Sequence, residues 1–160
     1  MEALASLLES GTIDVFAKML GWKIEPKPGF ADFEMPMRMF GVTGSVSLAG
    51  KLSGVVYLNL SDSTGEKAAE QILGEMPPVP ASEVNDVIGE LTNMISGNIK
   101  SKMSDRGYPC RLSIPTVMRG APVMIDTQAV PVKLGADFLL PNSSEIISVH
   151  LFARLDPETV

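Results

Sequence analysis

The sequence predicts an α+β protein, a single two-layer domain over residues 1–160 with a mainly antiparallel sheet and long helices packed on one face. Three observations lead to this prediction. Residues 82–105 have the three- and four-residue apolar spacing of a long helix, and residues 42–57 alternate as a β-hairpin does. Further strand-like runs fill the C-terminal third, in an order too irregular for repeated βαβ units.

The N-terminal third is predicted to hold one helix and one extended connector. Apolar residues at helical spacing favour a helix over residues 3–20, with Gly11 as a potential break and Gly21 as the C-terminal stop. The following segment, KIEPKPGFADFEMPMR (residues 23–38), holds three prolines and cannot continue a helix. We expect it to be an extended connector or an edge strand.

The middle of the chain predicts a hairpin followed by two helices. The hairpin turns at AGK, and a short helix begins at Ser61 or Asp62 and ends at Gly74. A proline-rich linker, EMPPVPA, then leads into the long helix of residues 82–105. Beyond it, strand-like runs are CRLSIPTV, DTQAVPVKLGADFLL and EIISVHLFARL, with turn signals at MRGAP and PNSS between them.

Composition and charge exclude several classes of protein. The 160 residues are 45% hydrophobic and 20% charged, as in ordinary globular proteins. The formal net charge of −6 argues against a nucleic-acid-binding protein, which normally carries a basic patch. No stretch approaches the roughly 18 apolar residues of a membrane span, and the N-terminus lacks an export signal. We therefore expect a cytoplasmic protein without membrane attachment.

One cysteine and one histidine leave little scope for thiol or metal chemistry. Cys110 cannot form a disulfide within the chain, which fits a reducing compartment. A dyad of Cys110 with His150 is conceivable, but we expect an inert buried cysteine and a core or edge-strand histidine. Neither the GxxxxGKS/T loop nor GxGxxG occurs, and no metal-ligand spacing is present. We expect no cofactor or metal of the protein's own.

The long helix has an unusual polar face. On a helical wheel one arc is apolar: Val84, Val87, Ile88, Leu91, Met94, Ile95 and Ile99. The opposite side holds Asp86, Glu90, Asn93, Gly97 and Lys100. Glu90 and Asn93 are three residues apart and hence neighbours, and Gly97 leaves a gap through which another backbone could approach. This face is either simply solvated or a partner-binding site.

The same helix has two further features. Asn98 falls near the apolar arc, so we expect it to be a satisfied, partly buried polar residue. The stretch GELTNMISG (residues 89–97) can also be laid without gaps on IDVFAKMLG (residues 13–21), which sets Asp14 against Glu90. This similarity allows a pseudo-duplicated fold whose first copy lacks the amide.

The ExxN spacing within DVIGELTNMISGN, followed by YPCRLSIP, resembles the motif of the CheC/CheX/FliY family of bacterial chemotaxis phosphatases. The resemblance covers most of the chain, and its single ExxN copy is most similar to CheX, because CheC proteins typically carry two. The family's Asp or Ser four residues before the Glu is matched by Asp86. Its later proline is matched by Pro115, about one residue too close to Asn93.

The resemblance implies a phosphatase that hydrolyses the aspartyl phosphate of a CheY-type response regulator. The regulator would bring Mg²⁺, the phosphoaspartate and a lysine, so that only an oriented water is missing. Asn93 would position that water, since an amide oxygen accepts from it, and Glu90 would pair with the lysine. Asp86, Ser96, Gly97 and Lys100 would complete the partner-binding face.

Alternatives remain at this point. The same fold could dock a receiver domain without hydrolysing it, and the offset at Pro115 keeps that interpretation open. An independent metabolic enzyme has little support. The resemblance also implies a homodimer through a continuous sheet, for which EIISVHLFARL would be an exposed edge. A relation to the deamidase CheD, known for CheC-type proteins, has no support in this sequence.

Overall fold

The computed structural model describes residues 2–27, 34–127 and 129–156, and contains three helices and seven strands in these ranges. The elements follow the chain in this order: α1 (Glu2–Leu20), β1 (Glu25–Pro26), β2 (Met37–Gly50), β3 (Leu52–Leu60), α2 (Asp62–Leu73), α3 (Ala81–Ser104), β4 (Cys110–Leu112), β5 (Thr116–Ile125), β6 (Val132–Leu139) and β7 (Ile146–Leu155).

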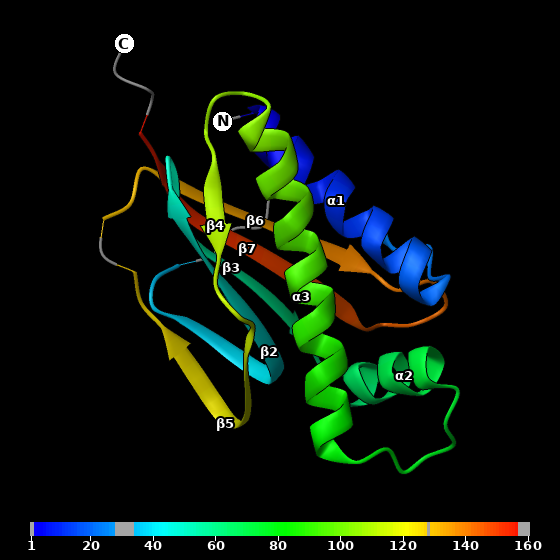
Figure 1. Cartoon of the computed structure of the whole chain (residues 1–160). Coiled ribbons are helices and arrows are strands. Elements are labelled where there is room, and N and C mark those ends of the chain that lie inside the picture. Colours follow the sequence, from blue (N-terminus) through cyan, green and yellow to red (C-terminus); the bar gives the residue numbers. More distant parts are fainter. Residues whose placement is uncertain (1, 28–33, 128, 157–160) are drawn as a thin grey trace.

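The strands form one sheet in which every pairing is antiparallel. Its order is β1-β6-β7-β3-β2-β4, and β5 pairs with the same edge of β2 as β4, nearer the N-terminus of that strand. The helices pack on one face, where α1 and α3 cross the strands side by side and α2 lies at one end (Figure 1). The predicted α+β class, with helices on one face, is confirmed.

The main core lies between the sheet and the helices. Alternate residues of β3 and β7 face it, such as Val56, Leu58 and Val149, and meet the apolar faces of α1 and α3. A smaller cluster of Met37, Met39, Ile125 and Phe152 lies on the other face of the sheet. On this other face β3 contributes the half-buried Val55 and Tyr57, so its second side is only partly covered.

Local signals set the element boundaries as predicted. The Ser61 hydroxyl accepts from the backbone N–H of Thr64 and caps α2, which ends at Gly74 in the left-handed region. Gly21, also left-handed with φ 69°, ends α1. The hairpin turns at Gly50 and Lys51 as expected. Part of the proline-rich segment, residues 28–33, lies outside the described residues, and Pro26 belongs to the predicted edge strand.

Three expectations about local structure are wrong. Gly11 does not break α1, because it is buried where the helix crosses α3, and a methyl group there would lie 3.6 Å from Cβ of Asn98. The stretch MRGAP is no turn but the interior of β5, where a register shift between Met39 and Gly41 of β2 absorbs the irregularity. Finally, CRLSIPTV is not one strand, since residues 113–115 separate β4 from β5.

The predicted exposed edge at EIISVHLFARL is also wrong. This stretch forms β7, which pairs with β6 on one side and with β3 on the other. Its length and apolar character result from burial in the middle of the sheet. The homodimer therefore stays a prediction, and β7 no longer supports it, because this strand is not an exposed edge.

The topology excludes a Cys110–His150 dyad. Cys110 lies in β4 and faces the helix-side core, whereas His150 lies in β7, separated from β4 by β3 and β2, and stacks on Phe152 of the other face. Burial raises the pKa of the Cys110 thiol, which keeps it protonated and unreactive, although Lys100 acts in the opposite direction. Within the described residues, no helix is both long and apolar enough to cross a bilayer.

Candidate active site

α3 is placed close to the sheet by a glycine beneath it. A methyl group on Gly44 of β2 would overlap the hydroxyl of Thr92, so the absence of a side chain there lets the helix descend onto the strand. The buried hydroxyls of α3 are satisfied within the helix: Thr92 donates to the carbonyl oxygen of Ile88 at 2.7 Å, and Ser96 donates to that of Thr92 at 2.8 Å.

The helix presents the predicted face outward. The apolar arc is buried, except that Met94 is half-buried. Asp86, Glu90 and Lys100 are exposed, and Asn93 and Gly97 are half-buried. A Cβ added at Gly97 would meet nothing within 4 Å, so space beside Asn93 is open. The carboxylate and the amide are thus neighbours on a surface accessible to another protein.

Two polar residues of α3 do not lie where the sequence predicted. Ser96 is 0% exposed and faces the core, so the expectation that it contacts a partner is wrong. Ser96 lies 100° from Gly97 around the helix axis and so points inward, and its hydroxyl donates to the backbone carbonyl oxygen of Thr92. Asn98 is exposed rather than partly buried. It lies at the edge of the contact between α1 and α3, beside Gly11 of α1, where its amide stays accessible to solvent.

One flank of the face is formed by the β4–β5 connection. A methyl group on the buried Gly89 would lie 3.4 Å from Cβ of Pro115 and 3.5 Å from Cγ2 of Val117. Gly89 and Asn93 are one turn apart, so Pro115 lies about one helical turn from the amide. At this edge, Arg119 of β5 forms an ion pair of 3.3 Å with Asp62 of α2.

The other flank is a groove where the three helices meet, which we call the three-helix groove. Its volume is about 480 Å³, and Glu90 forms part of its lining together with residues from the ends of α1 and α2. The sequence did not predict this groove, because the residue pattern of α3 does not indicate where the ends of α1 and α2 lie relative to it. Gly89 was missed for the same reason, although its smallness was a usable signal of close packing.

The acidic residues of the face interact with each other. The carboxyl group of Glu75 raises the pKa of Glu83, by hydrogen bonding with it and by repulsion, and Asp86 adds to the repulsion. This end of α3 is therefore electronegative. Across the described ranges no cluster of three or more histidine, cysteine, aspartate or glutamate side chains could hold a metal ion.

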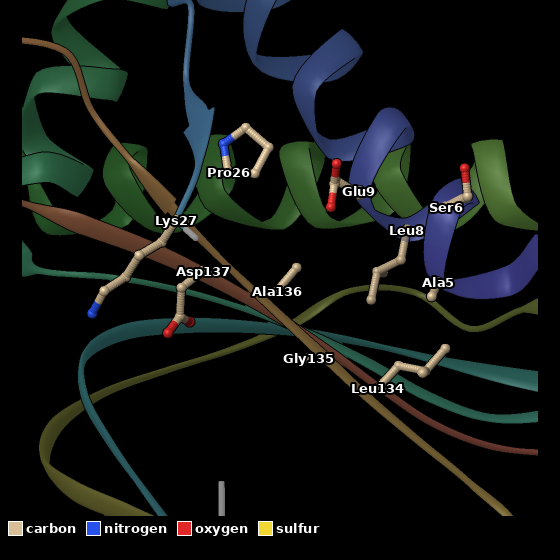
Figure 2. Close-up of a pocket in the computed structure, with 10 residues that line it drawn as sticks. All are labelled: Ala5, Ser6, Leu8, Glu9, Pro26, Lys27, Leu134, Gly135, Ala136 and Asp137. Carbon is tan, nitrogen blue, oxygen red and sulfur yellow. The ribbon is translucent and has the colours of Figure 1, made fainter. Parts of the chain in front are cut away.

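A second pocket, of about 490 Å³, lies away from this face between the first half of α1 and strands β1 and β6 (Figure 2). Glu9 of α1 lines it, with Lys27 after β1 and Asp137 of β6. None of the predicted site residues is part of this lining. Lys27 and Asp137 lie on paired backbones, where the Lys27 N–H donates to the Asp137 carbonyl oxygen at 2.8 Å, and Glu9 comes from the helix. The pocket holds neither Glu90 nor Asn93, so α3 remains the candidate active site.

Comparison with known proteins agrees with the resemblance in the sequence. The family model described as chemotaxis phosphatase CheX matches residues 42–135. A relative from Thermotoga maritima named CheY-P phosphatase CheX is 29% identical over 136 residues, which cover 82% of this chain and 84% of the relative.

Two solved structures share the fold. The chemotaxis protein CheX from Desulfovibrio desulfuricans has a TM-score of 0.82 at 19% identity, covering 95% of this chain and 99% of that one. A CheX–CheY–BeF3–Mg²⁺ complex from Borrelia burgdorferi has a TM-score of 0.75 at 23% identity, covering 93% and 96%.

The fold and the outward Glu-x-x-Asn pair define the class: this is a protein of the CheC/CheX/FliY group, as the motif predicted. Within that group the chain belongs to the CheX family of chemotaxis phosphatases. The matched residues include the whole of α3, and so both members of the pair. The pseudo-duplication stays a prediction, and Asp14 is an exposed residue of α1.

Proposed function

We propose that this protein hydrolyses the aspartyl phosphate of a CheY-type response regulator, with Asn93 orienting the attacking water and Glu90 pairing with the regulator's active-site lysine. The observation that carries the proposal is the position of the two side chains, one turn apart on the outward face of a helix fixed to the sheet from behind. Family membership supports the same activity, since the Thermotoga relative is named for it.

The chemistry of phosphoaspartate hydrolysis suggests different roles for Asn93 and Glu90. Water attacks phosphorus, the bond between phosphorus and the aspartate oxygen breaks, and inorganic phosphate and the free carboxylate are released. An amide oxygen accepts a hydrogen bond from the water and fixes it in line, which lowers the entropic part of the barrier. Such an amide needs no shifted pKa. The half-burial of Asn93 restricts its rotamers and so favours this positioning role.

Glu90 has a different role because it is more exposed and charged. A carboxylate that pairs with a lysine of the partner fixes the register in which the phosphoaspartate faces Asn93. Asp86 and Lys100, which are exposed on the same helix, extend this contact. Mg²⁺ enters with the regulator and supplies charge neutralisation at the phosphoryl group, and the reaction takes place in the cytoplasm, where the receiver is phosphorylated.

The test is the decay of a phosphorylated receiver with and without the protein. Asn93→Ala is expected to reduce the accelerated rate by about 100-fold or more, while binding to the BeF3-activated receiver is retained. Asn98→Ala is the matched control, because it removes an exposed amide from the same helix on another flank. Turnover that survives Asn93→Ala would remove Asn93 from the mechanism.

The alternative is a module that binds a receiver without hydrolysing it. It predicts that the unmodified protein binds the BeF3-activated receiver yet leaves the decay rate of the phosphorylated form unchanged. Glu90→Gln separates the two roles, since losing the lysine pair raises KM more than it lowers kcat. The predicted homodimer is tested separately, by light scattering at micromolar concentration.

A further inference from the structure

The three-helix groove adjoins the candidate active site and has no assigned role. Its walls are apolar: Met19 from the end of α1, Ile72 and Leu73 from the end of α2, and Val87 from α3. Leu73 is 42% exposed, a large fraction for a leucine, while Met19 and Ile72 are half-buried against the main core. Apolar surface that is concave and still accessible to solvent is suited to an apolar side chain from outside.

The rim of the groove has one sign of charge. Glu83, Asp86 and Glu90 line it, and no lysine or arginine belongs to the lining. Glu75, from the connection after α2, lies close enough to Glu83 to hydrogen bond with it, which adds a fourth carboxyl group at this end of α3. A partner that enters the groove must therefore carry basic residues around its apolar side chain.

Glu90 belongs both to the groove and to the catalytic pair. From Glu83 to Asn93 the helix rises about 15 Å, which is well within the footprint of one protein–protein contact of standard size. Any receiver that sets its phosphoaspartate against Asn93 covers Glu90, and its surface then continues over the groove. The groove and the pair thus contact the same partner.

We infer that the three-helix groove is a second receiver-binding subsite, which takes an apolar side chain flanked by a lysine or arginine and so determines which receiver is dephosphorylated. This inference rests on the proposed function. It assigns a docking role to Leu73, Ile72 and Met19, none of which lies on the polar face of α3. The methionine adapts its shape to the entering side chain, as unbranched thioethers do.

The experiment replaces Leu73, whose exposure makes a loss of folding stability small. Leu73→Gln is expected to raise KM for the phosphorylated receiver, and Kd for its BeF3-activated form, by about tenfold, with kcat at saturation unchanged. Ile146→Gln is the matched control, because Ile146 is 38% exposed and lies near the opposite end of α2, beside Glu145, which bonds Ser63. The control is expected to leave both constants unchanged.

The acidic rim is tested by the double substitution Glu75→Gln/Glu83→Gln, because neither residue belongs to the contact proposed for the Glu90–Asn93 pair. It is expected to lower the association rate and to weaken its dependence on salt, whereas Asp105→Asn, at the far end of α3, leaves both unchanged. Chemistry is not expected to change in any of these variants, since Asn93 is untouched.

The outcomes separate the inference from the proposed function. If Leu73→Gln binds and turns over like Ile146→Gln, the subsite is overturned, while the effect of Asn93→Ala still tests catalysis. If the unmodified protein does not accelerate decay, the proposed function fails, and the Kd measurements with the BeF3-activated receiver still test the groove. A loss of self-association on Leu73→Gln, with Kd unchanged, would assign the groove to a second copy of this chain and overturn the inference.

Discussion

Pro115 lies directly against Gly89, at a distance where a methyl group on the glycine would just touch Cβ of the proline, 3.4 Å away. Gly89 precedes Glu90 and is one turn from Asn93, so this contact brings the β4–β5 connection near the candidate catalytic pair. Pro115 therefore borders the candidate site although it is closer to Asn93 in sequence than the family pattern has it.

The contact predicts how Gly89 responds to substitution. Gly89→Ala should fold normally, since its methyl group meets Pro115 and Val117 at ordinary contact distances. Gly89→Leu has no room, so we expect it to displace Pro115 and to lower the phosphatase rate several-fold relative to Gly89→Ala. Urea unfolding and receiver dephosphorylation measure both effects. Equal activity of the two variants would show that the proline's position is unimportant.

Substitution of Gly97 is predicted to affect stability and receiver binding in opposite directions. Nothing lies within 4 Å of a Cβ added there, so Gly97→Ala should stabilise α3 by up to about 1 kcal/mol through helix propensity. If the partner's loops close over this glycine, the same variant should weaken receiver binding. Thermal unfolding and Kd for the BeF3-activated receiver are the two measurements. A gain in stability with unchanged Kd would refute the role of Gly97 in docking.

Gly44 is predicted to be essential for seating α3. A methyl group there would overlap the Thr92 hydroxyl, and Ile88 Cγ2 would be 3.3 Å away. We expect Gly44→Ala to lower the free energy of unfolding by about 1–3 kcal/mol through overpacking. Adding Thr92→Ala removes the overlapping oxygen and should recover part of this loss in denaturant unfolding. No recovery in the double variant would mean that another contact causes the damage.

His150 predicts a dependence of stability on pH. Burial lowers its pKa from the ordinary 6.5, and Asp137 opposes this change. The folded state therefore favours neutral histidine, so its contribution is complete above about pH 6.5 and is lost as pH falls through the lowered pKa. Urea unfolding between about pH 5.5 and 7.5 should show this loss.

The variant His150→Gln should remove that loss, since His150 is the one histidine of the chain. Glu83 contributes with the opposite sign, because a raised carboxyl pKa favours the folded state as pH falls. That contribution persists in the variant, so the difference between the two proteins isolates the histidine. A difference that does not change with pH would contradict the prediction.

The sequence predicted those features that depend on neighbours along the chain. Side chains three and four residues apart share a helix face, which placed Glu90 and Asn93 together and opposite the apolar arc. Glycine in the left-handed region ended α1 at Gly21 and α2 at Gly74 for reasons of local geometry. The motif and this element order also sufficed to identify the family.

Other features depend on packing between segments far apart in the chain, and periodicity carries no information about them. An apolar alternating stretch looks the same at an edge or in the middle of a sheet, so the burial of β7 between β6 and β3 was decided by pairing. Likewise, Ser96 is buried although its neighbour Gly97 is not, because successive residues are turned by 100° around the helix axis. Which of the two faces the sheet depends on how α3 packs against Gly44.

The sequence by itself thus determined which two side chains form the candidate catalytic pair, because their spacing within one helix settles it. The tertiary structure decided what surrounds them: Pro115 on one flank, through the missing side chain of Gly89, and the three-helix groove on the other. Those surroundings arise from close packing among α1, α2, α3 and β5, and close packing depends on the shapes of all partners at once.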